Sequence, residues 1–213
     1  MSAKQIVHEY ISSSNQLKVL SFLAKFPDQE MHEREIARRT GISFGSANKV
    51  LNELFSDGIL MRRQAGRMLF YSFNSRDPLS KGFKIFVSVS ILRPLIRKLR
   101  EFTSEIVLYG SCARGEDTSA SDIDLFVVSE NKEAVLRALE NYKFGKGFEG
   151  IRIEPAVFSA QELLKSEKAD KEFLSLVREG IVLWDKMKDE AGIQGMSPSG
   201  QDYPFSAREK ARR

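Results

Sequence analysis

The strongest constraint on the fold is a short segment, Gly110 to Gly115, followed by two aspartates, Asp122 and Asp124, that are set among apolar residues. The apolar runs on either side predict a strand, a tight turn and a second strand. Successive side chains of a strand point to opposite faces, so the two aspartates share one face while Ile123 and Leu125 point into a core. The fold must therefore hold two like charges beside buried apolar residues.

Two carboxylates next to a glycine-containing turn suit a phosphate-bound metal. Carboxylates a few ångströms apart repel each other, and a cation between them relieves the repulsion. Magnesium prefers hard oxygen ligands and bridges carboxylates to substrate phosphates. The turn at Gly110 and Ser111 offers a hydroxyl and backbone N–H donors that can approach phosphate closely. The pattern predicts a clamp for a nucleoside triphosphate, although one Asp alone also suits a strand-start cap, and Gly-Ser alone an ordinary turn.

The bulk composition limits the class of protein. The 213 residues, 42% of them hydrophobic and 29% charged, suffice for two small globular domains. A net charge of +4 is compatible with a polyanionic partner without requiring one. The single cysteine, Cys112, excludes an internal disulfide, favours a reducing compartment and is expected to be a packing residue. No apolar run approaches the ~20 residues of a membrane span, so we expect a cytoplasmic protein with no membrane partner.

The first third of the chain has the pattern of a small helical domain, which we place at residues 1–76. Apolar periodicity predicts three helices, at residues 16–26, 32–39 and from Ser43 to about residue 57. Two β-like runs follow at residues 59–63 and 68–73 and predict a hairpin. Residues 16–74 resemble the winged helix-turn-helix domains of prokaryotic transcription regulators, with residues 35–41 matching their second helix. That resemblance implies DNA as a partner.

A helix-turn-helix places its third helix in the major groove, so polar residues off the buried stripe are expected to reach bases and phosphates. Basic residues on the hairpin are placed to grip phosphate or a minor groove. A winged helix also serves as a protein or dimer contact, so a homodimer is an open alternative. The candidate DNA-binding residues are Ser43, Ser46, Asn48, Lys49, Arg62, Arg63 and Arg67.

The rest of the chain alternates between helix and strand patterns. We predict a packed connector at residues 77–90, a second domain at 91–186 and a disordered tail at 187–213. Basic residues but no acidic ones occur between Leu79 and Arg100, which indicates either an extended basic surface or the solvated face of a helix. Within the second domain we expect helices at residues 91–102, 134–142, from about 160 and at 171–179, and strands at 105–109, 122–128, 151–158 and 181–184.

The segment from Gly110 to Gly115, with residues 121–125, resembles the signature of minimal nucleotidyltransferases of the DNA polymerase beta superfamily, over roughly residues 90–185. The resemblance implies an α/β (α+β) fold with a mixed sheet flanked by helices. It also implies that a nucleoside monophosphate is transferred from a triphosphate while pyrophosphate leaves, with Mg²⁺ as the metal and Mn²⁺ as the alternative. By the same resemblance, Asp122 and Asp124 hold metal, and Ser111 holds the triphosphate beside the backbone donors of Gly110.

Two further residues complete the expected site with less specificity. A third carboxylate normally binds the catalytic metal and helps deprotonate the acceptor; here the candidate is Glu154. The family usually has Asp at this place, and a solvated Glu beside Pro155 is the alternative. Arg114 is placed either to steady a phosphate or to balance Glu116 and Asp117.

Two functions therefore compete. The first is a magnesium-dependent nucleotidyltransferase that uses a nucleoside triphosphate, with ATP expected, and that its winged helix directs to nucleic acid or to a partner. Some similar enzymes act as antitoxins that adenylylate a toxin partner, which is one acceptor class; a protein and an RNA acceptor both stay open, and the sequence selects neither. The second is a DNA-binding transcriptional regulator whose nucleotidyltransferase-like domain is an inactive nucleotide sensor or scaffold. Fold analogy does not separate the two.

Overall fold

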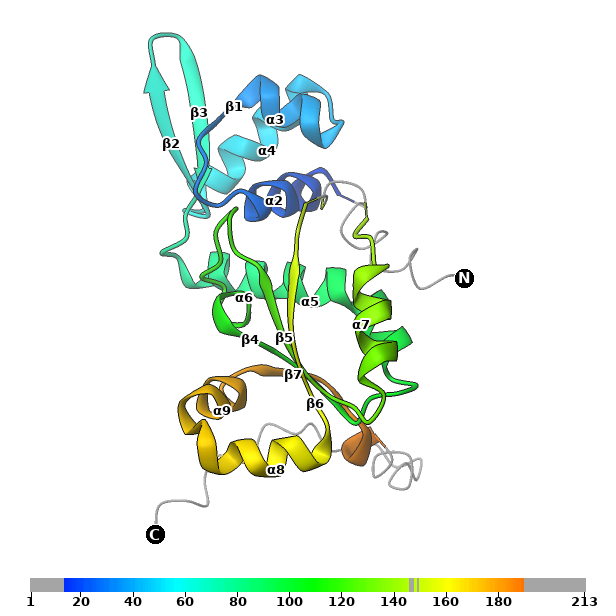
Figure 1. The fold of residues 1–213 in the computed structure, drawn as a ribbon. Coiled ribbons are helices and arrows are strands. Elements are labelled where there is room, and N and C mark those ends of the chain that lie inside the picture. The colour runs from blue at the N-terminus through cyan, green and yellow to red at the C-terminus, as the bar shows by residue number, and fades with distance from the viewer. Residues whose placement is uncertain (1–13, 146–147, 149, 190–213) are drawn as a thin grey trace, which may run out of the picture.

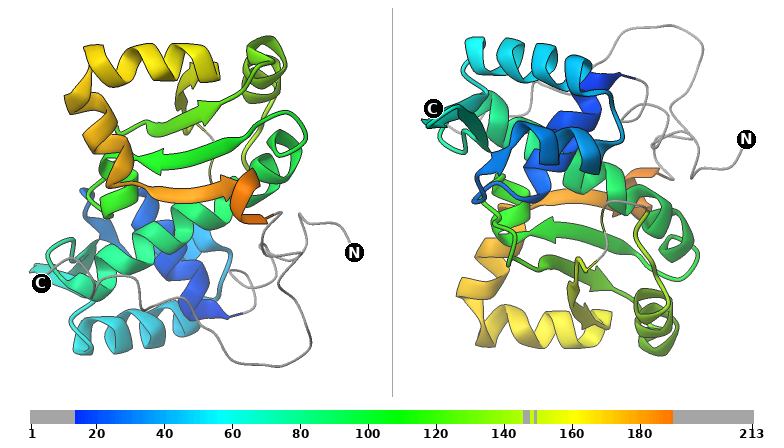
Figure 2. Two further views of the ribbon diagram at one scale, coloured as in Figure 1. Left: turned by 90° about the horizontal axis from the view of Figure 1, so that it is seen from below. Right: turned by 90° about the horizontal axis from the view of Figure 1, so that it is seen from above.

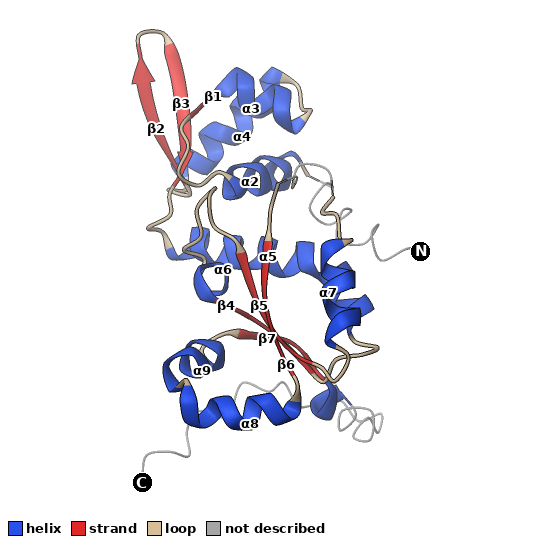
Figure 3. Ribbon diagram, in the orientation of Figure 1, coloured by secondary structure: helices blue, strands red, loops and turns tan. Residues whose placement is uncertain are grey.

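The structure is a computed structural model that describes residues 14–145, 148 and 150–189, and all structural statements below concern these residues. Most of the predicted tail at 187–213 lies outside them. The fold is mixed α/β, as expected, with two sheets that belong to two parts of the chain (Figure 1 and Figure 3). We call residues 14–76 the N-terminal region and residues 78–185 the sheet region.

Three helices and a hairpin build the N-terminal region. Each helix begins at a capping side chain: Ser14, His32 and Ser43 accept hydrogen bonds from backbone N–H groups of the first turn. Gly41 ends the second helix with φ at 71°, a left-handed conformation that suits glycine. The helices are α2 (Asn15–Lys25), α3 (Glu33–Thr40) and α4 (Phe44–Ser56), close to the predicted ranges.

The predicted hairpin is present, and it gains a third strand. Strands β2 (Leu60–Ala65) and β3 (Met68–Phe73) pair in antiparallel register, and Gly66 lies in the turn with φ at 61°. The two-residue strand β1 (Met31–His32) adds to β3, giving the order β1-β3-β2. A strand of two residues is too short to show an alternating pattern, so the sequence did not predict it.

Helix α5 (Pro78–Leu99) begins well before the expected start at residue 91. Asp77 caps it by accepting from the backbone N–H of Ser80, and Pro78 occupies the first turn, where proline needs no hydrogen-bond donor. The residues expected to be a connector, 77–90, are therefore part of one long helix. Val87 packs in the core of the N-terminal region, whereas Leu92 and Leu95 pack in the core under the sheet.

The sheet region contains a mixed four-stranded sheet of order β6-β5-β4-β7. The central pair, β4 and β5, is antiparallel; β5 and β6 are parallel, and β4 and β7 are antiparallel. The strands lie close to the predicted ranges, at β4 (Glu105–Tyr109), β5 (Ile123–Val128), β6 (Ile153–Phe158) and β7 (Ile181–Asp185).

Helices cover both faces of this sheet. One face packs against α5 and α7 (Lys132–Glu140), and the other against α8 (Ala160–Ala169) and α9 (Lys171–Arg178). Figure 2 shows the N-terminal region stacked on the α5 side, away from α8 and α9. None of the helices in the described ranges combines the length and the apolar character needed to cross a membrane.

Candidate functional site

The predicted Gly-Ser turn is a short helix, α6 (Gly110–Arg114), placed between β4 and β5. Gly110 has φ at 70°, which disfavours other residues. A Cβ built on Gly110 would lie 2.1 Å from Oδ2 of Asp124, so a side chain there would collide with the carboxylate. Glycine is therefore required for two reasons, its backbone conformation and the close approach of Asp124.

Asp124 lies at the centre of the candidate site. It pairs with Tyr109 across the antiparallel strands and with Glu154 across the parallel strands. Burial raises the pKa of the Asp124 carboxyl, the charges of Asp122 and Glu154 raise it further, and Arg114 opposes them. Burial and the charges of Asp124 and Glu154 also raise the pKa of Tyr109. The predicted carboxylates are thus near enough to act on one another.

Asp122 forms an ion pair with Arg152, which the sequence did not predict. Its Oδ1 accepts a hydrogen bond of 2.7 Å from Nε of Arg152, and its Oδ2 lies 3.3 Å from a terminal guanidinium nitrogen of the same side chain. The two residues immediately precede the paired residues Ile123 and Ile153 in β5 and β6. A parallel pairing of these two strands, had it been assumed, would have placed Arg152 beside Asp122.

Glu154 is exposed, and the three carboxylates do not form a ready-made metal centre. In the described ranges, no three His, Cys, Asp or Glu side chains are arranged to hold a metal ion. The chemistry of the donors still fits a divalent cation, because Asp124 is crowded by like charges that a cation would relieve. Asp122 would have to turn away from Arg152 to become a ligand.

The remaining predicted residues of the site lie on or beside α6. Arg114 is exposed, and its Nε donates a 3.0 Å hydrogen bond to Glu116, the alternative that the sequence analysis had left open. Cys112 is buried, and burial raises the pKa of its thiol to about 12, which suits a packing residue rather than a nucleophile. Its Sγ lies 3.5 Å from the backbone oxygen of Asp122. Ser111 is partly exposed.

A cavity of about 380 Å³ lies on the opposite side of β5, between that strand, α2 and α5. Its apolar wall includes Ile123 and Ile151, which belong to the core under α5. Asp122 lines this cavity, whereas Asp124 and Glu154 do not. The cavity is therefore separate from the place where Asp124 and Glu154 face each other.

The candidate DNA-binding residues are brought to one part of the molecule, but several of them have partners within it. Ser43 caps α4, and its hydroxyl donates to the hydroxyl of Ser46. Asn48 donates to Glu33 at 3.1 Å. Such contacts stabilise the region and compete with any contact to a base.

Of the basic candidates, two have partners within the N-terminal region and two are free of them in the described residues. Arg63 pairs with Glu30 at 2.6 Å and lies over the ring of Phe70. Arg62 donates to Asn52 and lies over Phe55. Lys49 and Arg67 are exposed. Within the residues that the structure covers, these last two have no polar partner.

Comparison with known proteins bears on the sheet region. A search of the curated proteins found no match. A solved structure from Sulfolobus solfataricus, of a protein assigned as a nucleotidyltransferase, is 18% identical over 51% of this chain and 89% of its own, with a TM-score of 0.32. The profile of the nucleotidyltransferase domain matches residues 89–195, which include α6, both aspartates and Glu154. Because that match spans half of the sequence, the chain belongs to the nucleotidyltransferase domain family.

Proposed function

We propose that the chain is a magnesium-dependent nucleotidyltransferase that transfers a nucleoside monophosphate, with ATP as the expected donor, to an acceptor. Membership of the family supports a transferase that uses a nucleoside triphosphate. The observation that carries the proposal is the contact between Gly110 and Asp124. A carboxylate that is forced against the backbone of a glycine and crowded by two other acids is costly to keep, and a ligand-binding role accounts for it.

The residues divide the work as follows. Asp122 and Asp124, together with Glu154, would hold a divalent cation, which supplies charge neutralisation to the phosphates when bound. Gly110 and Ser111 offer backbone and hydroxyl donors to the triphosphate. Glu154 is exposed and can accept a proton from an acceptor hydroxyl that approaches β6.

A label-transfer experiment tests the proposal. ATP carrying a radioactive α-phosphate is incubated with the protein and magnesium or manganese, with the protein itself, a tRNA pool or cell lysate as acceptor. We expect covalent label that is absent in the Asp122→Ala/Asp124→Ala variant. If the wild type gives no label with any acceptor, or if the variant labels as well as the wild type, the enzyme proposal fails.

A second candidate function is favoured by the pairing of Asp122 with Arg152. An aspartate neutralised by arginine, beside an exposed Glu154, also suits a domain that binds a nucleotide without transferring it. In that case the protein is a transcriptional regulator with a nucleotide-sensing domain. Magnesium-dependent ATP binding without label transfer would support this function over the first.

We also propose that the N-terminal region is a winged helix that binds duplex DNA. Its three helices and hairpin have the order of such a domain, and Lys49 and Arg67 project from α4 and from the hairpin. A homodimer on DNA is part of this proposal. Gel-shift measurements over a salt series test it, because binding through phosphates weakens steeply as salt rises. Absent or salt-independent binding would contradict it.

A further inference from the structure

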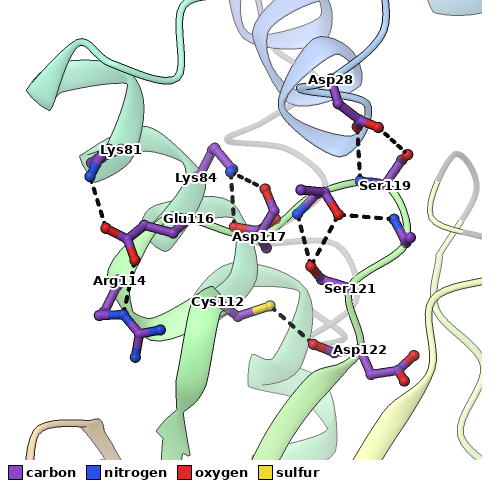
Figure 4. A network of polar contacts seen from close by, with 12 residues as sticks. Asp28, Lys81, Lys84, Cys112, Arg114, Glu116, Asp117, Ser119, Ser121 and Asp122 are labelled. Atoms are coloured by element: carbon purple, nitrogen blue, oxygen red, sulfur yellow. Dashed lines mark hydrogen bonds and ion pairs between the residues drawn. The ribbon is translucent and has the colours of Figure 1, made fainter.

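A loop of eight residues, 115–122, connects α6 to β5 and ends at Asp122. It therefore connects the Gly-Ser end of the site on α6 to the aspartates at the start of β5. Apart from Asp122, which bonds to Arg152 immediately before β6, the side chains of this loop form no hydrogen bonds or ion pairs with the strands of the sheet within the described residues. Its contacts run instead to residues of α5 and to the loop after α2, as Figure 4 shows.

Lys84 of α5 is the most unusual of these partners. Its side chain is 1% exposed, and a lysine is rarely buried unless its charge is paired. Its Nζ lies 3.2 Å from Oδ1 of Asp117 and donates to the backbone oxygen of the same residue. Oδ1 of Asp117 is buried and accepts no hydrogen bond in the described ranges. Its negative charge is therefore compensated by the ion pair with the ammonium of Lys84. A buried pair of this kind adds little net stability, because removing two charges from water costs about as much as their attraction gains, whereas removing only one partner is strongly destabilising.

Two weaker contacts hold the same loop from the same side. Lys81 pairs with Glu116 at 2.9 Å, and the backbone of Gly115 passes so close to Lys81 that a Cβ would lie 2.4 Å from its backbone oxygen. Asp28 accepts two hydrogen bonds of 2.9 Å, from the backbone and the hydroxyl of Ser119. The loop is thus anchored at three successive points.

The three residues that anchor the loop all lie in the part of the sequence before the family domain. Asp28, Lys81 and Lys84 all precede residue 89, where the match to the nucleotidyltransferase domain begins. We propose that Lys84 is a positioning residue: by holding Asp117 it fixes the loop and hence Asp122, so that the part of the chain before the family domain completes the site. This inference rests on the proposed function for its effect on transfer, but not for its effect on the loop.

The sequence provides an internal probe for the loop. Cys112 is the only cysteine, it is buried, and its Sγ contacts the backbone oxygen of Asp122. Loosening the loop would expose the thiol to a reagent such as dithiobis(nitrobenzoic acid). The charges of Asp117 and Lys84 also act on the pKa of the Cys112 thiol, so the labelling rate is measured over a range of pH to separate thiol ionisation from exposure. Measured in this way on nucleotide-free protein, the rate reports anchoring without any assumption about catalysis.

The test uses the full chain and two variants. Lys84→Met leaves Asp117 buried without its partner and is expected to destabilise the protein. Lys84→Met/Asp117→Leu removes both charges, so its melting temperature is expected to return close to that of the wild type. The double variant still lacks the bond from Nζ to the backbone of residue 117. If Lys84 positions the loop, Cys112 labelling rises about tenfold or more and transfer falls about 10- to 100-fold in this folded double variant.

The matched control is Arg137→Met/Glu133→Leu, which removes an exposed ion pair on α7 and is expected to change neither rate. If Cys112 reacts and nucleotide is transferred in the Lys84→Met/Asp117→Leu variant at the wild-type rates, the pair contributes only packing and the proposal is overturned. If the wild type itself neither binds nor transfers a nucleotide, the proposed function fails. Faster Cys112 labelling in the double variant would then still support the anchoring of Asp122.

Discussion

Asp124 in the sheet region and two polar candidates of the N-terminal region, Ser43 and Asn48, lie in opposite environments. In the sheet region, Asp124 is held against Gly110 and crowded by Asp122 and Glu154. In the N-terminal region, Ser43 caps its own helix and Asn48 donates to a neighbouring helix. The first arrangement is costly to the fold unless a ligand is bound, whereas the second stabilises the fold directly. Unrelieved charge is therefore a better guide to a site than the place of a polar residue on a helix.

The largest expected effect concerns the two aspartates. Asp122→Ala/Asp124→Ala removes the charges that would hold the cation, so we expect transfer to fall about 10³-fold, the order seen when a group that stabilises transition-state charge is removed. The fold should persist, because removing crowded like charges relieves repulsion. Label transfer and a melting curve together check this, and a variant that merely unfolds would not support it.

The next largest effect concerns Gly110, where a side chain would both strain the backbone and collide with Asp124; a control glycine separates the two causes. Gly110→Ala places a methyl group on Asp124 and strains a backbone with positive φ, so we expect transfer to fall about 100-fold and stability to fall by about 1–3 kcal/mol. Gly66→Ala is the control, because Gly66 also has positive φ but has nothing within 4 Å of its built Cβ. Denaturant unfolding should show a cost of about 1 kcal/mol for the control, with unchanged transfer. Equal losses of transfer would contradict the role of the collision.

Arg152 allows the two candidate functions to be compared. Arg152→Ala frees the carboxylate of Asp122, and because the guanidinium is exposed to solvent, the stability of the fold should change little. We expect tighter magnesium-dependent ATP binding, measured by titration calorimetry. Weaker binding would instead show that Arg152 contacts the nucleotide and that its pairing with Asp122 is not inhibitory.

On the hairpin, Arg67 and Arg63 form a matched pair for the DNA proposal. Arg67→Ala should weaken duplex binding severalfold and reduce the slope of log K against log salt by about 0.9. Arg63→Ala should do less, because Glu30 already neutralises that guanidinium. Gel shifts at several salt concentrations measure both slopes. Equal slopes for the two variants would show that the ion pair opens on DNA.

The smallest effect concerns the link between the two regions. Burial alone would raise the pKa of Asp28, but hydrogen bonds from Ser119 and the charge of Lys84 lower it below its ordinary value. A lowered carboxyl pKa stabilises the fold above the unfolded pKa, about 4, and this contribution is lost as the pH falls through the folded pKa. Asp28→Ala should therefore cost up to about 1 kcal/mol at pH 7 and less at pH 2, where Asp28 gains protons. Urea unfolding at both pH values measures the difference.

Much of the fold could be predicted from the sequence, because most elements carry local signals. Asp170 caps α9, and Ser159 with Glu162 forms a reciprocal cap at α8. The start of α5 was missed because Asp77 and Pro78, with Ser80 and Gly82 after them, were interpreted as a domain boundary, whereas Asp77 and Pro78 in fact form a good helix start. Such a conflict between neighbouring signals is decided by packing, which the sequence does not display.

The candidate site was predictable only in part. The spacing of Asp122 and Asp124 predicted that Ile123 and Leu125 point into a core, and both lie there. Asp122, however, precedes β5 and lines the cavity that Asp124 does not line. The partners of these residues depend on which strands are neighbours, so Arg152 could not be assigned before the order of the sheet was known. Lys84 was expected on a basic surface or a solvated face, and neither is correct, because its side chain is buried against Asp117.

The continuity of α5 has a consequence for anyone who divides this protein. A cut at residue 77 leaves Asp28 on one fragment and Ser119 on the other, and a cut at residue 90 splits a helix between two hydrophobic cores and also removes Lys84. Neither fragment would then carry a complete set of supports for the loop that ends at Asp122. Any fragment of this protein therefore has to keep α5 whole, because the helix packs in the cores of both the N-terminal region and the sheet region.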